Sequence, residues 1–385
     1  MHKYKIALII PSFPPYRIPL LNLISANKDI DFYVICLCRP EKKKKWKVNY
    51  SEITFSYTIL PGICFFIKKY DWWIHINWGL LKTINKFNPD IIIAAGYDSL
   101  ASWESFIFCK IRKKPFILWN ETTTLSVRSM KGLIRFIKRI IVANSDICIA
   151  SGKKAKEYLL KFGVDEEKII CCINTLDSEK FYKRAWEYRK SINFNIERRK
   201  YPHLLLLFVG RLIKKKNVFT LLKAIEKLND RDIGLLIIGN GLDKEHLKKY
   251  CAANNLKNVY FEGFKQQEEL PKYYALADAF VLPSIREEWG LVVNEALSTG
   301  LYILCSNIVG SSYDLIKENW NGILFEPSNI NELADSIKKI KRELDEIHNR
   351  RLSISEIMIK NFSPNKAAEC FLSAIKNSIE KDDKI

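Results

Sequence analysis

The stretch Ser284-Ile-Arg-Glu-Glu-Trp-Gly-Leu-Val-Val-Asn-Glu-Ala-Leu297 holds two glutamates, Glu287 and Glu295, with seven residues between them. An apolar run, Ala277 to Pro283, precedes it and predicts a buried strand. A helix is predicted from Leu291 to Thr299, where a glycine follows. This is a strand–loop–helix unit, from which parallel α/β sheets are built. One carboxylate lies in its loop and the other in the first turns of its helix.

The start of the predicted helix is suited to an anion, because its free amides and its dipole attract negative charge. Gly290 lets a ligand approach the backbone closely at this point. Two carboxylates repel a phosphate, so we expect Glu287 and Glu295 to bind neutral hydroxyl groups beside it. Phosphate and hydroxyls together describe a nucleotide sugar. The alternative is that both acids lie on a solvated helix start, where Glu is common.

The same segment resembles the E-x7-E signature of retaining glycosyltransferases of family 4. Its Pro283-Ser284 pair, Glu287, Trp289, Gly290-Leu291 and Glu295 stand in the register of that signature. The resemblance implies that Glu287 binds the hydroxyls of the donor sugar and that Glu295 binds the ribose. It also implies transfer with retention of the anomeric configuration and without a metal ion.

Two further elements of the second half resemble the same family. The strand-like run Leu204 to Val209 is followed by Gly210, Arg211 and Lys216, like the family's G-R-L…K-G element, whose Arg and Lys bind the diphosphate. Asn217 stands where that element has glycine, and Asn tolerates the same left-handed backbone. A strand predicted from Val259 leads to Phe264, and the resemblance implies that the backbone there holds the nucleobase. The implied donor-binding residues are Gly210, Phe264, Gly290, Leu291, Val292 and Glu295.

The length of 385 residues predicts two domains, each with alternating strands and helices and a parallel sheet. The resemblance implies the GT-B architecture, in which two Rossmann-like domains face a cleft. We expect an acceptor-side domain over residues 1–185, a polar linker from Phe181 to Pro202, and a nucleotide-sugar domain over 200–362. A final helix within 366–385 is the candidate to cross back to the first domain. The predicted strands are Tyr4–Ile10, Phe32–Cys38, Asp90–Ala95, Pro115–Trp119, Asp146–Ala150, Leu204–Val209, Leu235–Ile238, Val259–Phe261, Ala279–Leu282 and Tyr302–Cys305.

Cysteine usage indicates a reducing compartment. The ten cysteines lie mostly in apolar runs, no Cys-x-x-Cys pair occurs and the five histidines are scattered. Neither a disulfide framework nor a zinc site is therefore predicted, and no cofactor is expected besides the donor substrate. The N-terminus reads as a strand rather than a signal peptide, and no apolar run is long enough to span a bilayer. We expect a cytoplasmic protein, with attachment to the cytosolic face of a membrane left open.

The net charge of +19 is concentrated in the first half, with about +13 of it before residue 181. One basic segment, Lys131 to Val142, has helical periodicity, with apolar residues on one side and cations on the other. It is either a helix that packs on its own sheet or one that binds an anionic membrane surface. Nucleic acid is not an expected partner, because no recognised binding module accompanies the charge.

Four residues are candidates for contact with the acceptor. Tyr16 and Arg17 follow the first strand in a Pro-x-Tyr-Arg variant of the family's loop. Asp98 and Glu121 follow two other strands, at the carboxyl ends where parallel sheets bind ligands. Acids at such positions also cap helices, so Asp98 has the alternative role of an N-cap.

These residues together predict a hexosyltransferase that moves a sugar from a nucleoside diphosphate to a hydroxyl of a lipid-linked or glycan acceptor, in polysaccharide, lipopolysaccharide or glycolipid assembly. Arg211, Lys216 and Glu287 are its expected catalytic residues, because preorganised charges would stabilise the departing diphosphate. Two alternatives are a nucleotide-sugar epimerase of the same fold and a membrane-docked protein that binds the donor without turnover. Asp-x-Asp pairs, which hold a metal ion in other transferases, occur at Asp29 and Asp230, and we expect both to lie in turns.

Overall fold

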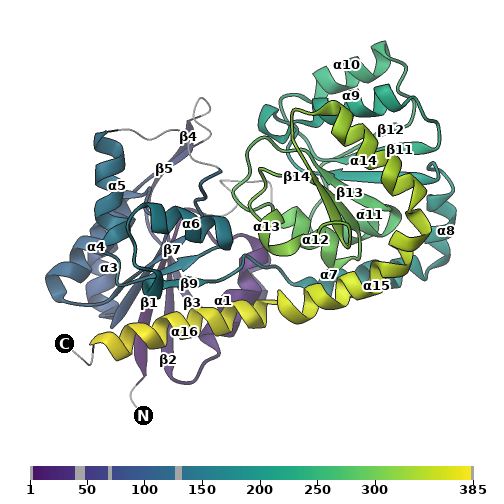
Figure 1. The fold of residues 1–385 in the computed structure, drawn as a ribbon. Coiled ribbons are helices and arrows are strands. Elements are labelled where there is room, and N and C mark those ends of the chain that lie inside the picture. The colour runs from purple at the N-terminus through teal and green to yellow at the C-terminus, as the bar shows by residue number, and fades with distance from the viewer. Residues whose placement is uncertain (1–2, 40–47, 68–71, 126–131, 383–385) are drawn as a thin grey trace. The chain divides into compact units, whose positions relative to one another are not determined.

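The computed structural model describes residues 3–39, 48–67, 72–125 and 132–382. It divides into two compact units, Met1–Thr175 with Pro364–Ile385 and Leu176–Ser363 (Figure 1). Each unit is an α/β structure around a parallel sheet, which confirms the predicted fold class of two Rossmann-like domains. Among the described residues, no helix is long and apolar enough to cross a lipid bilayer.

The first unit contains a seven-stranded parallel sheet in the order β3-β2-β1-β6-β7-β8-β9. Its strands are almost purely apolar, as expected when both faces of a sheet are covered. They are β1 Tyr4–Ile10, β2 Ile30–Cys36, β3 Ser56–Ile59, β6 Ile91–Ala95, β7 Phe116–Asn120, β8 Ile147–Ala150 and β9 Ile169–Cys171.

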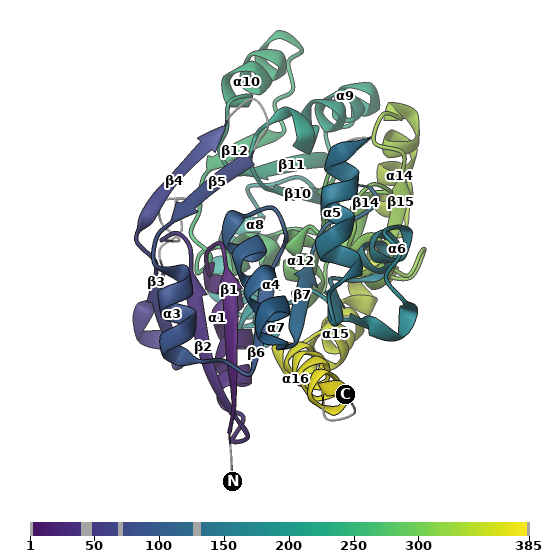
Figure 2. The ribbon, with the colours of Figure 1, turned by 90° about the vertical axis from the view of Figure 1, so that its left-hand side faces the viewer.

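Helices cover both faces of this sheet. One face packs on α1 (Ile18–Ser25) and on the final helix, α16 (Pro364–Asp382), whose Phe371 meets the ring of Trp119 edge-on at 4.8 Å. The other face packs on four helices, which Figure 2 shows in front of the strands or beside them. These are α3 Leu80–Phe87, α4 Leu100–Arg112, α5 Leu133–Ala143 and α6 Lys153–Lys161. The final helix therefore belongs to the first unit, although it follows the second in sequence.

A separate antiparallel hairpin of β4 (Gly62–Ile67) and β5 (Trp72–Asn77) also belongs to the first unit (Figure 2). The sequence analysis predicted no strand here. Alternate β4 side chains do not follow a simple buried–exposed pattern, and Phe65 and Phe66 are both exposed.

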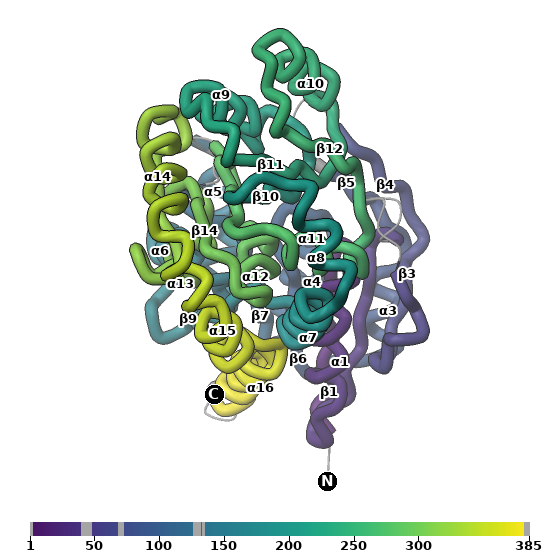
Figure 3. Tube along the Cα trace, turned by 90° about the vertical axis from the view of Figure 1, so that its right-hand side faces the viewer, coloured from purple at the N-terminus to yellow at the C-terminus, as the bar shows by residue number. Residues whose placement is uncertain are grey.

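The second unit has a six-stranded parallel sheet in the order β12-β11-β10-β13-β14-β15. Four central strands are buried along their whole length. The strands are β10 Leu204–Val209, β11 Ile233–Ile238, β12 Val259–Gly263, β13 Ala279–Leu282, β14 Tyr302–Ser306 and β15 Gly322–Phe325. Figure 3 shows α9 beside α14 within this unit. Its helices are α7 Ser178–Arg189, α8 Ile192–Arg198, α9 Val218–Leu228, α10 Lys244–Ala253, α11 Leu270–Leu276, α12 Leu291–Ser298, α13 Ser312–Leu315, α14 Ile330–Arg342 and α15 Leu344–Asn361.

The stretch predicted as a polar linker, Phe181 to Pro202, instead forms most of α7 and all of α8 within the second unit. Long-range polar contacts hold these helices, which a search for an apolar stripe does not detect. Arg189 donates to the carbonyl of Thr299 at 2.6 Å, and Arg198 pairs with the buried Asp278 at 2.7 Å. Burial alone would raise the pKa of Asp278, but a hydrogen bond with His348 and the charges of Arg351 and Arg198 lower it to about 2.

Candidate functional site

The loop after β10 forms the floor of the candidate site in the second unit. Gly210 donates its amide to the carbonyl of Ile238 at 2.9 Å, which joins the ends of β10 and β11. A Cβ at Gly239 would lie 1.8 Å from the carbonyl oxygen of Gly210, so only glycine allows this approach. Arg211 follows and is exposed. Asn217 has the left-handed conformation, with φ of 54°, and starts α9, as expected for the residue that replaces glycine.

Lys216 and Glu287 form an ion pair that joins the β10–α9 loop to the β13–α12 loop. The ammonium and the carboxylate are both largely buried, with side-chain exposures of 11% and 17%. Backbone contacts hold the two loops together, since Ile285 donates to the carbonyl of Lys215 at 2.9 Å. The Lys216 side chain also lies against Gly210, within 3.8 Å of where a Cβ would stand. The structure therefore brings three of the predicted residues together.

The N-terminus of α12 is left open by Gly290. This glycine is the N-cap, has φ of 90° and provides no side-chain hydrogen bond to the first amides of the helix. Leu291 and Val292 follow and are partly exposed. The first turn thus retains amides that a ligand can bind, next to the Lys216–Glu287 pair in the same strand–loop–helix unit.

Glu295 lies one turn into α12 and accepts a hydrogen bond from the hydroxyl of Tyr274 at 2.6 Å. Burial raises the pKa of its carboxyl to about 7, and the Tyr274 hydroxyl opposes part of that rise. One carboxylate oxygen is therefore oriented by a buried tyrosine. Tyr274 lies fully within the core and was not identified from the sequence.

The segment after β12 places Phe264 at the surface, with 40% of the residue exposed. It follows Gly263, which has φ of 74° and whose carbonyl accepts from the amide of Gly239 at 2.7 Å. The β12 end is thus tied through Gly239 to the β10 end. The predicted base-binding and phosphate-binding loops consequently belong to one edge of the sheet.

In the first unit, Arg17 and Glu121 form an ion pair at the carboxyl ends of β1 and β7. The guanidinium is buried and stacks over Trp119 at 4.3 Å from the ring centre, while Glu121 keeps 40% of its side chain exposed. Asn174 donates to the same Glu121 oxygen at 3.0 Å. Tyr16 precedes Arg17, and burial raises the pKa of its hydroxyl.

Asp98 is not in this cluster. It pairs with Lys138 of α5 at 2.8 Å. The alternative role as N-cap of α4 falls to Ser99, whose hydroxyl accepts from the amide of Ser102 at 3.1 Å. The acceptor-side candidates therefore divide into Tyr16, Arg17 and Glu121 together and Asp98 separately.

Several polar groups at the two sites have no signal in the sequence pattern. Asn174 and Tyr274 orient Glu121 and Glu295, yet each lies in a segment distant in sequence from the acid that it contacts. Within the described residues, the buried hydroxyls of Ser284 and Ser311 lack a hydrogen-bond partner, and the Ser311 amide bonds to the carbonyl of Trp289 at 3.0 Å. The first hydroxyl lies in the quoted motif, and the second is brought beside it by the fold.

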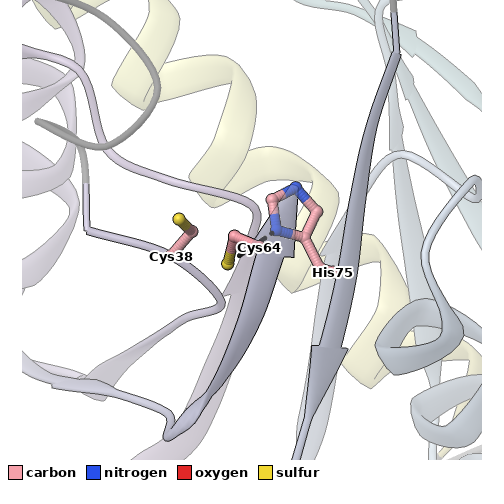
Figure 4. A group of neighbouring side chains, drawn as sticks. All are labelled: Cys38, Cys64 and His75. Atoms are coloured by element: carbon pink, nitrogen blue, oxygen red, sulfur yellow. Dashed lines mark hydrogen bonds between the residues drawn. The ribbon is translucent and has the colours of Figure 1, made fainter. Parts of the chain in front are cut away.

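Two groups of side chains could in principle hold a metal ion. One is the Asp-x-Asp pair of the second unit, and the other is a group of cysteines and a histidine in the first unit. Asp230 and Asp232 lie at a turn, where Lys341 binds them at 2.7 and 3.0 Å. In the first unit, however, Cys38, Cys64 and His75 come together, with ligand atoms within 4.8 Å of one another (Figure 4). The sequence analysis predicted no zinc site because these residues are scattered along the chain.

Comparison with known proteins finds a family match within the second unit. Residues 189–361 match the family model of glycosyl transferases group 1. An uncharacterized glycosyltransferase of Methanocaldococcus jannaschii is 30% identical over 200 residues, which cover 50% of each chain. The N-acetylgalactosamine-N,N'-diacetylbacillosaminyl-diphospho-undecaprenol 4-alpha-N-acetylgalactosaminyltransferase of Campylobacter jejuni is 26% identical over 232 residues, which cover 58% of this chain and 60% of that protein. The match thus spans about half the length of each relative.

A solved structure matches almost the whole chain. The crystal structure of Anabaena HepE in complex with UDP and glucose superposes with a TM-score of 0.74 at 16% identity, and the match covers 97% of this chain and 99% of that one. At this level of identity the likeness concerns the fold, which is that of GT-B proteins.

Proposed function

We propose that this chain, which has the GT-B fold, is a member of glycosyl transferases group 1 and moves a sugar from a nucleoside diphosphate to an acceptor hydroxyl. The observation that carries this proposal is the buried Lys216–Glu287 pair at the open N-terminus of α12. A cation, free helix amides and a carboxylate at one sheet edge fit a ligand that has both phosphate and hydroxyl groups. The HepE structure, in complex with UDP and glucose, has the same fold.

The transfer step needs stabilisation of the charge that develops on the departing diphosphate. An ammonium has three N–H donors, so Lys216 can keep its bond to Glu287 and direct another donor to a phosphate. Arg211 and the amides of Gly290, Leu291 and Val292 supply the remaining donors. These groups are held before the donor arrives, so little reorganisation is required. We propose that the positive charge of these groups stabilises the departing diphosphate, a role that a divalent ion has in other transferases.

The two acids take different parts of the donor in this proposal. Glu287, beside Lys216, accepts from hydroxyls of the sugar, whereas Glu295, deeper in α12, accepts from the ribose. Tyr274 fixes one Glu295 oxygen and leaves the other for the ligand. We further propose retention of the anomeric configuration, which follows from the E-x7-E resemblance and needs product analysis by nuclear magnetic resonance.

We propose that the acceptor is a lipid-linked or glycan hydroxyl bound in the first unit near Arg17 and Glu121. The half-exposed Glu121 carboxylate can accept from a hydroxyl while Arg17 and Asn174 hold it. The Campylobacter relative carries a diphospho-undecaprenol acceptor in its name. Assembly of a polysaccharide or glycolipid is the function that fits these features.

A lipid-linked acceptor would place the first unit at a membrane surface. Helix α5 exposes Phe136, Ile137 and Ile140 while Arg135 and Arg139 are also exposed. Two further apolar residues of this helix, Ile141 and Val142, are buried in the unit. Exposed apolar and basic residues on one helix fit the headgroup region of an anionic leaflet. We propose peripheral attachment through this helix.

A thermal-shift screen of nucleotide sugars tests the donor, because a ligand that binds only the folded state raises the melting temperature. At a concentration 100 times the dissociation constant, the stabilisation is about 2.7 kcal/mol. The active donor should then release nucleoside diphosphate only when a lipid-linked acceptor is added. Conversion of the donor without an acceptor would establish the epimerase instead. Binding with no turnover on any acceptor would establish a binding protein.

A further inference from the structure

A cluster of soft ligand atoms lies in the first unit, outside the proposed donor and acceptor sites. Cys64 of β4 and His75 of β5 are direct cross-strand partners, and His75 Nδ1 lies 3.3 Å from Cys64 Sγ. Cys38 follows the end of β2 and completes the group, as Figure 4 shows. All three ligand atoms lie within 4.8 Å of one another. Cys38 and His75 are buried, with 2% and 7% of each residue exposed.

These distances are close to those of a tetrahedral metal site. Bond lengths of about 2.3 Å for sulfur and 2.0 Å for nitrogen place neighbouring ligand atoms about 3.6 Å apart. The observed separation of Cys64 and His75 is slightly shorter than this, and the other pairs lie within 4.8 Å, so they would close by about 1.2 Å at most. Two sulfurs and one imidazole favour Zn²⁺ over Mg²⁺ or Ca²⁺, which prefer oxygen ligands.

The side chain of Asn77 lies beside the cluster and is suited to hold a water molecule in the fourth ligand position. Asn77 lies two residues after His75, so its side chain leaves β5 on the same face. Its Nδ2 donates to the carbonyl of Leu37 at 2.8 Å, and Cys64 Sγ points to the same carbonyl at 3.5 Å. Asn77 Oδ1 is buried and, among the described residues, has no hydrogen-bond partner. A water molecule on a metal ion would donate to this oxygen.

We propose that Cys38, Cys64 and His75 bind one Zn²⁺ ion, with water held by Asn77 in the fourth position, and that the ion fastens the β4–β5 hairpin to the end of β2. The thiols of Cys38 and Cys64 release their protons to solvent as the metal binds. The hairpin gains most from such a bond, because an isolated pair of strands is marginally stable. This zinc site is independent of the proposed transfer reaction.

Metal analysis of the purified full-length protein, desalted into metal-free buffer, tests the proposal. Wild type should retain about one zinc ion per chain. Cys64→Ser and His75→Gln should each lose most of it. Cys171→Ser is the matched control, since it removes an exposed thiol from the same unit and should leave the zinc content unchanged. Far-ultraviolet circular dichroism shows whether each variant is folded.

Cobalt substitution tests the site without any mutation. After removal of zinc by a chelator, titration with Co²⁺ alone should produce a thiolate-to-cobalt charge-transfer band that saturates at about one equivalent and disappears when Zn²⁺ is added. Wild-type protein without zinc and without this band would overturn the proposal. So would equal zinc content in wild type and folded Cys64→Ser, or a Cys38–Cys64 disulfide found by mass spectrometry in protein purified under reducing conditions.

Discussion

The two units hold their charged side chains in different ways. In the second unit, Lys216 and Glu287 extend from loops that backbone contacts fix, and the helix amides beside them belong to the same motif. In the first unit, Arg17 and Glu121 are joined by side chains alone, with Trp119 and Asn174 as supports. A backbone-built site suits the constant part of a donor, its diphosphate. A site built from side chains can change between proteins while the fold remains the same, which suits an acceptor that varies.

The largest effect is expected in the second unit. Lys216→Ala should lower turnover by about ten- to a hundredfold, because a hydrogen bond to a charged group contributes roughly 1.5–3 kcal/mol. Arg211→Ala should lower it by at least about tenfold for the same reason. Steady-state release of nucleoside diphosphate measures both. Lys214→Ala, an exposed lysine of the same loop, is the control and should be unaffected. Wild-type turnover in both variants would remove the diphosphate from this loop.

The sequence could predict residues that lie in one contiguous segment, as in the second unit, more readily than residues that the fold brings together. The Gly210–Lys216 and Glu287–Glu295 segments are each contiguous, so their spacing indicated two loops that lie within the region matched by the model of glycosyl transferases group 1. The edges of the central strands were predicted within a few residues because long apolar runs mark them. The sequence analysis did not predict β3, β9 and β15, which have three or four residues each.

Contacts between distant segments could not be predicted from spacing. Tyr274 is separated from Glu295 by 21 residues, and Asn174 from Glu121 by 53. The Cys38–Cys64–His75 cluster depends on the hairpin register and on the path of the chain after β2. Its residues follow no short metal-binding motif, so only the three-dimensional structure reveals them. The basic run Lys42 to Lys45, which contributes to the positive charge of the first half, lies outside the described residues.

Membrane binding should depend on the first unit alone. Arg135→Gln combined with Arg139→Gln should weaken binding to anionic vesicles by about tenfold or more, since each cation contributes about 1 kcal/mol at the surface. Co-sedimentation at moderate salt measures the change, and donor binding should remain at the wild-type level. Lys338→Gln, an exposed charge of the second unit, is the control. Equal sedimentation of wild type and the double variant would assign α5 no role at the membrane.

The acceptor cluster should show a smaller effect that is confined to transfer. Arg17→Lys keeps the charge but loses the planar guanidinium that stacks on Trp119 and pairs with Glu121. We expect about a fivefold loss of turnover with a lipid-linked acceptor and no change in affinity for nucleoside diphosphate. A loss of donor affinity in this variant would contradict the proposal that the first unit binds the acceptor and the second unit binds the donor.

The smallest effect concerns stability without ligand. Glu295 has a folded-state pKa of about 7, above its ordinary value of 4.5. Its contribution to stability is therefore fully present below about pH 4.5 and is lost as the pH rises through about 7. Glu295→Gln should reduce the change in the free energy of unfolding with pH between pH 5 and 8. Urea denaturation at a series of pH values measures this change. Glu262→Gln, at an exposed position, should keep the wild-type slope.

The most direct test of the donor site is calorimetric titration of nucleoside diphosphate into wild type, Glu295→Ala and Glu287→Ala. The proposed roles predict that Glu295→Ala weakens binding, because it removes the partner of the ribose. Glu287→Ala should bind nucleoside diphosphate nearly as wild type does and yet transfer sugar poorly, because its partner is the sugar. The reverse pattern, with binding lost in Glu287→Ala and kept in Glu295→Ala, would contradict the assignment of the two acids.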